Sequence, residues 1–324
     1  MASDWHLVHL GSRAVGGAGA VIAEASAVEA RGRISPADLG VWKDAHIEGL
    51  ARIARFVKQL GAVPGIQLAH AGRKASTWAP GRGDGAIPDE SGGWQTVAPS
   101  AIPFRPADPV PAELSVTEIG VIVEAFAQAA RRAREAGFEV VEIHAAHGYL
   151  LHQFLSRLSN RRGDEYGGSF DGRTRMVREV AAAVRAIWPG AFPLFIRISA
   201  TDWVEGGWNP DESVELAKGL RECGVDLVDC SSGGSSPDAR IPAAPGYQVG
   251  FAERIRREAG ILTGAVGLIT EAEQADHIIR GGQADLVLLA REFLRSPYWP
   301  LHAARELGRE AEVPPQYLRG FPKQ

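Results

Sequence analysis

Two histidines and a tyrosine follow an apolar run near the middle of the chain. The run 138–143 leads directly into His144, and His147 and Tyr149 follow it. Imidazole and phenol groups are typical of general acid–base chemistry. A plainer interpretation is that either histidine is a hydrogen-bonded residue at a strand end. The spacing of His144 and His147 could also suit a metal, but no carboxylate or third ligand stands at a recognisable spacing, so we expect none.

Other apolar runs also end in residues that could do chemistry. If these runs are parallel strands, their carboxyl ends meet, and an amide, two imidazoles, a phenol and two guanidinium groups converge there. No acidic pair with an obvious nucleophile is among them, which argues against a glycosidase. The residues at the other strand ends are Ala25, Gln67 to His70, Arg197, the turn 231–234, the turn 264–267 and Arg291.

Short apolar runs that follow helix-like segments must position these groups. Several of the helix-like segments end at glycine, which accepts the left-handed conformation that a helix terminus often needs. The runs are nearly continuous in apolar residues, as in parallel strands covered on both faces. There are seven of them: Val21–Glu24, Gly65–Leu68, Val140–Ile143, Leu194–Ile198, Val225–Val228, Ile261–Gly264 and Asp285–Leu289.

Helical patterns separate the runs, for example at 45–60, 116–136, 173–187 and 211–222. This alternation predicts βαβ units and a parallel sheet, and seven or eight units favour an α/β (β/α)8 barrel. Two long connections, 75–115 and 156–171, follow strands and should lie at the mouth of the barrel as binding loops or lids. No change in composition marks a second domain, so we expect one domain over 1–324.

The last two runs carry a possible phosphate site. Gly264 and Gly267 follow one run, and Ala290-Arg291 follows the next. Barrels often bind phosphate there through backbone N–H groups, and an arginine would add a bidentate cation. Two glycines after a strand are weak evidence by themselves, since turns need glycine. The pattern Gly17-Ala18-Gly19 precedes a strand instead of following one, which excludes a dinucleotide fingerprint.

Composition excludes several classes of protein. The chain has 324 residues, 45% of them hydrophobic, and a formal net charge of −4, which gives no general attraction to nucleic acid or anionic lipid. Its two cysteines, Cys223 and Cys230, argue against a disulfide scaffold and an iron–sulfur cluster and fit a reducing cytoplasm. Residues 16–27 imitate a signal peptide but contain Glu24, and no apolar run approaches the roughly 20 residues that span a bilayer.

Longer motifs resemble those of one family. Ile66–Arg73 reads IQLAHAGR and Glu142–Leu150 reads EIHAAHGYL, and the segments 154–156, 158–161 and 164–169 continue the match. These motifs are similar to the Old Yellow Enzyme family of flavin ene-reductases, and most similar to the bacterial subgroup of xenobiotic reductases and YqjM-like enzymes. The resemblance runs from about Trp5 to Phe321. It implies FMN in the barrel mouth, NADPH or NADH as reductant, and a small activated alkene as substrate.

The resemblance also implies a role for each matched residue. His144 and His147 would donate hydrogen bonds to a carbonyl or nitro oxygen of the substrate, and Tyr149 would supply a proton at the α-carbon or help to orient the substrate. Arg197 would stabilise negative charge on the flavin. The other implied flavin contacts are Ala25 and Gln67 at the pyrimidine side, and Gly264, Gly267, Ala290 and Arg291 at the phosphate, where Ala290 replaces the family's usual glycine.

The start of the chain departs from the family pattern. Relatives open with one more strand, which carries a cysteine and a tyrosine near the flavin, whereas this chain reads Met-Ala-Ser-Asp-Trp and is already at the first helix. We therefore expect seven strands and an open barrel. The gene start is misplaced, or the protein is a truncated relative that binds FMN weakly.

Near the other end, Arg319 matches an arginine that enters a neighbouring subunit's active site in this subgroup. The resemblance therefore implies a homo-oligomer, a dimer or a tetramer. Two alternatives stay open at this point: a flavin-free barrel lyase or isomerase, and a non-catalytic relative that has lost FMN.

Overall fold

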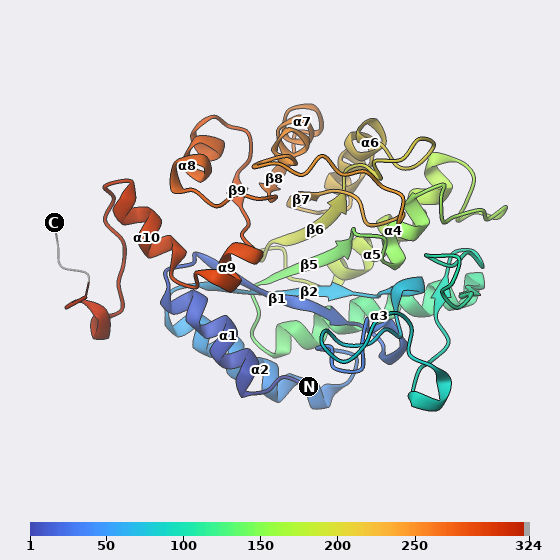
Figure 1. Cartoon of the computed structure of the whole chain (residues 1–324), viewed down its shortest axis with the longest axis horizontal. Helices are drawn as coiled ribbons and strands as arrows, with labels where there is room; N and C mark the ends of the chain where they lie inside the picture. The colour runs from blue at the N-terminus through green and yellow to red at the C-terminus, as the bar shows by residue number, and fades with distance from the viewer. Residues whose placement is uncertain (321–324) are drawn as a thin grey trace.

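One parallel sheet of seven strands forms the centre of the computed structural model, which describes residues 1–320 (Figure 1). All seven strands were expected, and the observed bounds are β1 (Ala20–Ala27), β2 (Val63–Ala69), β5 (Val140–Ala145), β6 (Leu194–Ser199), β7 (Leu227–Ser231), β8 (Leu262–Ala265) and β9 (Leu286–Val287). Strand β7 starts later than predicted because the Val225 N–H is taken by Leu220 O at the end of the preceding helix (3.0 Å). The seven-stranded barrel-type fold predicted from the sequence is confirmed.

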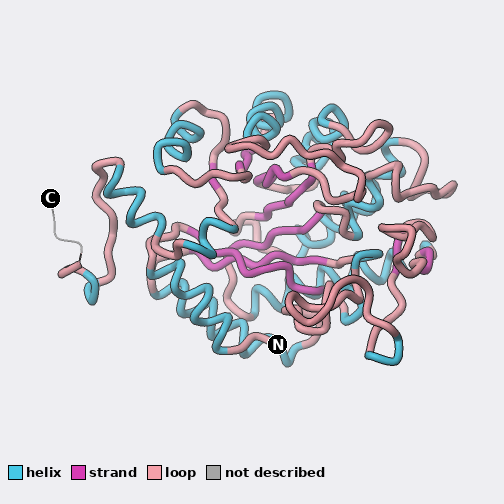
Figure 2. Tube along the Cα trace, viewed as in Figure 1, coloured by secondary structure: helices cyan, strands magenta, loops and turns pink. Residues whose placement is uncertain are grey.

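Helices surround the sheet (Figure 2). Ser115 caps one of them by accepting a hydrogen bond from the Glu118 N–H, and Ser169 caps another, which therefore starts before the predicted Arg173. The helices are α1 (Asp4–Val15), α2 (Ile47–Gln59), α3 (Val116–Glu135), α4 (Leu150–Leu155), α5 (Phe170–Ile187), α6 (Pro210–Glu222), α7 (Val249–Ala259), α8 (Ala272–Arg280), α9 (Arg291–Arg295) and α10 (Trp299–Glu306).

The sheet curls into a half-barrel that is not closed. The strands run in the order β1-β2-β5-β6-β7-β8-β9, and within residues 1–320 no strand pairs β9 with β1. After β9 the chain forms α9 and reaches the end of α1, where Arg13 donates to the Phe293 carbonyl (2.6 Å). Within the described residues, β9 therefore keeps one unpaired edge, and the outer edge of β1 is paired only at Ala27, which forms a single parallel bridge with Gly40.

The concave side of the sheet is built in layers. Val140, Phe195 and Leu227 form a small apolar cluster there, with Ile22 and Val63 packed against it. One step further along the strands, the sheet register pairs His144 with Arg197, and Arg197 with Asp229. Laterally paired residues of a parallel sheet point to the same face, so an ionic layer lies above the apolar one.

The two long connections pack against each other. Segment 75–115 contains the short parallel strands β3 (Val97–Ala98) and β4 (Ala112–Glu113). Arg162, from segment 156–171, donates to the carbonyls of Pro99 (3.0 Å) and Leu114 (2.5 Å). One buried guanidinium therefore holds segment 75–115 in place.

A second buried arginine joins three helices. Arg173 of α5, 1% exposed, donates to the Leu155 carbonyl at the end of α4 and to Glu212 Oε1 of α6 (2.5 Å). We predict that Arg173→Met lowers Tm by about 4 °C, because removing one partner of a buried pair costs about 3 kcal/mol. The control is Lys218→Met on the surface of α6, which should lower Tm by about 1 °C or less. Equal shifts in the two variants would contradict this role.

Candidate active site

The turn after β5 has a strained backbone that contacts hold from both sides. His147 has φ +58°, in the left-handed region that residues other than glycine rarely adopt. Its N–H donates to Ser199 Oγ at the end of β6 (2.9 Å), and its carbonyl accepts from Lys74 Nζ (2.8 Å). Neighbouring strand ends thus determine where the His147 ring points.

The structure brings His144, His147 and Tyr149 together. The His144 ring meets the His147 ring edge to face (5.2 Å between centroids) and the Tyr149 ring likewise (5.0 Å). His144 Nδ1 accepts from the Ala146 N–H (3.2 Å), so the proton of a neutral ring is on Nε2. His144 can therefore donate a hydrogen bond through Nε2.

His147 is held by Ser231, in the turn 231–234 that was expected at a strand end but was given no role there. Its Nε2 lies 2.7 Å from Ser231 Oγ at the end of β7. The only other acceptor near that hydroxyl in the described chain, Gln248 Oε1, is 3.4 Å away and is bonded by Ser232 Oγ at 2.6 Å. The shorter contact favours a Ser231 hydroxyl that donates to His147 Nε2, which leaves the proton on Nδ1 free to bind a ligand.

Both histidines are neutral at physiological pH. Burial lowers the pKa of His144 well below its usual value, and Arg197, His152 and Lys74 lower it further. Burial also lowers the pKa of His147, with His144 as the next cause. Each ring is therefore a neutral hydrogen-bond donor, and its charge does not change between about pH 6 and pH 9.

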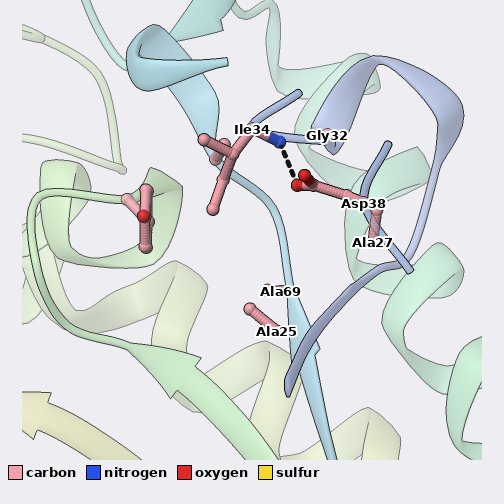
Figure 3. Close-up of a pocket in the computed structure, with 8 residues that line it drawn as sticks. Ala25, Ala27, Gly32, Ile34, Asp38 and Ala69 are labelled. Carbon is pink, nitrogen blue, oxygen red and sulfur yellow. Dashed lines mark hydrogen bonds between the residues drawn. The ribbon is translucent and has the colours of Figure 1, made fainter. Parts of the chain in front are cut away.

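A small cavity lies beside β1 and β2 (Figure 3). Tyr149 is one of the residues that line it. Ala25 and Ala69 line it, and the Ile34 N–H donates to Asp38 Oδ2 across it (2.6 Å). The β1–β2 register shifts between Ala23 and Ser26, the stretch that contains Ala25. Burial raises the pKa of Tyr149, and Asp38 raises it further, so the phenol keeps its proton at neutral pH.

Below the histidines lies the ionic layer. Gln67 Nε2 donates to Glu142 Oε1 (2.6 Å), and Arg197 Nε lies 3.1 Å from Asp229 Oδ2. Glu142 and Asp229 are 1% and 0% exposed, and Glu142 Oε2 and both Asp229 oxygens lack a hydrogen-bond partner in the described chain. This leaves two buried carboxyl groups beside one guanidinium.

The pair of carboxyl groups holds a proton. Burial, together with the neighbouring Asp229, raises the pKa of Glu142 to about 8. Burial also raises the pKa of Asp229, against the attraction of Arg197. Burial lowers the pKa of Arg197, but Asp229 and Glu142 outweigh burial and raise it. At pH 7 the group therefore consists of one cation, one carboxylate and one neutral acid.

The residues of the expected phosphate site lie at the ends of β8 and β9. Gly267 has φ +126°, and a side chain at Gly264 would clash with Leu288. Ala290 precedes α9, and Arg291 is its exposed first residue. Within residues 1–320 no hydrogen bond or ion pair joins Arg291 to the turn 264–267.

Arg319 lies apart from this group in its own chain. It is exposed and follows the short helix η5 (Pro315–Tyr317). Figure 1 shows this C-terminal segment beyond α10, on the side away from the loops that follow β2 and β5. The single chain does not bring Arg319 to the histidines.

Several residues of the site were missed by sequence reasoning. Lys74 and Ser199 contact the His147 turn over long range. For Ser231, the position at a strand end was expected and only its contact with His147 was missed. A signal did exist for Glu142 and Asp229, because a carboxylate inside an apolar strand is costly unless it is paired. The described residues contain no group of three or more His, Cys, Asp or Glu that could hold a metal.

Comparisons with known proteins agree with this geometry. A family model described as "NADH:flavin oxidoreductase / NADH oxidase family" matches residues 1–310. The chain belongs to this family. An NADPH dehydrogenase of Geobacillus sp. (strain WCH70) is 53% identical over 98% of this chain and 88% of that protein. An NADPH dehydrogenase of Bacillus subtilis (strain 168) is 48% identical over 98% of this chain and 89% of that protein. The crystal structure of morphinone reductase in complex with tetrahydroNAD is 29% identical, with a TM-score of 0.76 over 96% of this chain and 84% of that one.

Membership of this family, whose members include the Old Yellow Enzymes, makes the chain an oxidoreductase that uses FMN and NAD(P)H. It is inconsistent with a flavin-free lyase or isomerase. No helix of residues 1–320 is long and apolar enough to cross a membrane.

The site fits a flavin. The terminal nitrogens of Arg197 and the amide oxygen of Gln67 bind no protein group in residues 1–320. Ala25 and Ala69 leave space beside them.

The ionic layer predicts a pH dependence of stability. Because the pKa of Glu142 is raised from 4.5 to about 8, its contribution to stability is complete below about pH 4.5 and is lost as the pH rises through about 8. We predict that Tm of the wild type falls between pH 5 and pH 8 by about 5 °C more than Tm of Glu142→Gln.

The control for this measurement is Glu139→Gln, which removes the same charge just before β5. Its Tm should fall with pH as that of the wild type does. Parallel curves for Glu142→Gln and the wild type would show that Glu142 is already ionised at pH 5.

Proposed function

We propose that this protein is a cytoplasmic, FMN-dependent ene-reductase that reduces the activated C=C bond of α,β-unsaturated carbonyl or nitro compounds. In this proposal residues 1–324 act as one FMN-binding domain. The observation that carries it is the cluster of two neutral imidazole donors and a protonated phenol at the end of β5, where His144 pairs with Arg197 of the neighbouring strand β6. A flavin oxidoreductase needs such donors when its substrate develops negative charge on an oxygen.

Seven residues would hold the cofactor, which supplies the hydride when bound. Arg197 would place its two unpaired terminal nitrogens against the electron-rich edge of the flavin, and Gln67 would contribute its free amide oxygen. Ala25 would lie beside the ring because a larger side chain would fill the cavity it shares with Ala69. The phosphate would lie near Gly264, Gly267, Ala290 and Arg291.

His144 and His147 would bind the substrate oxygen. Nε2 of His144 and Nδ1 of His147 are the ring nitrogens left free by the protein's own hydrogen bonds. Two preorganised donors stabilise the charge that develops on this oxygen, and they polarise the double bond. Tyr149, whose raised pKa keeps it protonated, would deliver the proton to the α-carbon.

Replacement of either histidine tests the function. With 2-cyclohexenone and NADPH, kcat/KM should fall about 100-fold in His144→Ala or His147→Ala, because each change removes one donor to the substrate oxygen. The visible absorbance of bound FMN should remain. His277→Ala, on the exposed surface of α8, serves as the control. Loss of flavin with intact affinity for the enone would contradict the proposal.

We also propose that the protein is a homo-oligomer in which Arg319 enters the site of a neighbouring chain. The supporting features are an exposed C-terminal segment and a site that its own Arg319 does not reach. We predict that Arg319→Ala raises KM for 2-cyclohexenone about tenfold, as expected when about 1.4 kcal/mol of substrate binding is lost, while Tm stays unchanged. A monomer in sedimentation at micromolar concentration would remove the basis of this prediction.

A further inference from the structure

A second, larger cavity lies next to the site. Its volume is about 630 Å³, within the usual range for small-molecule sites. Segment 75–115 forms most of its wall, and Ile34 and Tyr149 line both this cavity and the small one beside Ala25. A ligand bound at Tyr149 could therefore extend directly into it.

The wall of the cavity combines aromatic rings with cations. The rings are Trp78, Trp94 and Phe104, and the cations are Arg73, Lys74 and Arg105. Two hydrogen bonds of Trp94 fix this wall. The indole N–H donates to the Arg31 carbonyl, and the main-chain N–H donates to Ser76 Oγ, both at 2.9 Å. Its shape is therefore built into the loop.

Lys74 is the cation closest to the catalytic groups. Its Nζ donates to the carbonyls of His147 (2.8 Å) and Gly234 (3.0 Å) and lies 4.5 Å from the centroid of the Phe104 ring. An ammonium group has three donors, so one N–H remains. Within residues 1–320 Lys74 has no carboxylate partner, although burial lowers its pKa to about 8.

The other charges of the cavity leave Lys74 uncompensated. Arg73, 6% exposed, donates only to backbone carbonyls, among them Ser235 O (2.7 Å). Three carboxylates also line the cavity, but Asp84 and Asp89 are exposed, and Asp108 already accepts from the Arg105 N–H (3.0 Å). Solvent screens charges at the exposed rim, so the inner end next to Tyr149 stays cationic.

We propose that this cavity binds an aromatic ligand that carries a carboxylate or phosphate group, with the anion on Lys74 and the ring against Phe104 and the two tryptophans. The inference rests on the proposed function only in that the same ligand would reach His144 and His147. The anion has two possible sources, a substrate and the phosphates of the nicotinamide dinucleotide.

The test compares two ligands that differ only in charge. Dissociation constants of 4-carboxycinnamaldehyde and its methyl ester are measured by titration calorimetry with the FMN-loaded enzyme in the absence of reductant. We expect the carboxylate to bind the wild type at least tenfold more tightly than the ester. Equal affinities would overturn the proposal, and this comparison needs no variant.

Variants then assign the preference to Lys74. Lys74→Met should weaken binding of the carboxylate about tenfold and of the ester less than twofold, whereas Lys74→Arg should keep most of the preference. Arg82→Ala, an exposed cation of the same loop that does not line the cavity, is the matched control. If Lys74→Met weakens both ligands equally, Lys74 only supports the His147 turn, and the proposal fails.

Titration with NADPH and NADH separates the two sources of the anion. If Lys74→Met lowers the affinity for NADPH tenfold and leaves the affinity for NADH unchanged, Lys74 binds the reductant's phosphate. If the affinity for NADPH is unchanged in this variant, Lys74 binds the anion of the substrate. Turnover of uncharged 2-cyclohexenone by the wild type is measured in parallel. Without such turnover the proposed function fails, while a preference for the carboxylate would still support an anion site.

Discussion

The buried ion group of Arg197, Asp229 and Glu142 is the constraint on which the site depends. A guanidinium keeps its proton at any accessible pH, so burying one requires a counter-charge nearby. The pairing of β6 with β7 sets Asp229 beside Arg197, and Glu142 lies one strand away on β5. If Glu142 were ionised as well, the group would carry excess negative charge. Because the pKa of Glu142 is raised, this carboxyl group keeps its proton at pH 7 and the excess does not arise.

This group separates the two parts of the half-barrel's concave side. Below it, Val140, Phe195 and Leu227 pack as an ordinary apolar core. On its other side, the sheet register places His144 beside Arg197. Burial is the main cause of the lowered pKa values of both histidines, and Arg197 adds to it. The cation that pairs with Asp229 therefore also helps to keep the two imidazole rings neutral.

The sequence predicted the seven strands and the cluster at the end of β5, because both depend on local patterns: apolar runs, glycines at helix ends and polar residues where a strand stops. It did not predict the contacts that orient the cluster. Ser199, Ser231 and Lys74 lie 52, 84 and 73 residues from His147 along the chain, and a hydrogen bond over such separations leaves no periodic trace. The sequence did not predict the cavity under segment 75–115 for the same reason, since the wall of the cavity depends on how an irregular loop folds back on itself.

Gly148 and Gly234 carry a consequence for remodelling this enzyme. A side chain on Gly148 would collide with the Gly234 carbonyl, and one on Gly234 would come within 2.6 Å of the His147 backbone. The turns after β5 and β7 are therefore interlocked, each shaped to the bare backbone of the other. If only one of the two turns were replaced by that of a relative, its backbone would no longer fit the backbone of the turn that was kept. The two turns form one exchangeable unit, and in a recombination library a crossover between them would separate parts that must be inherited together.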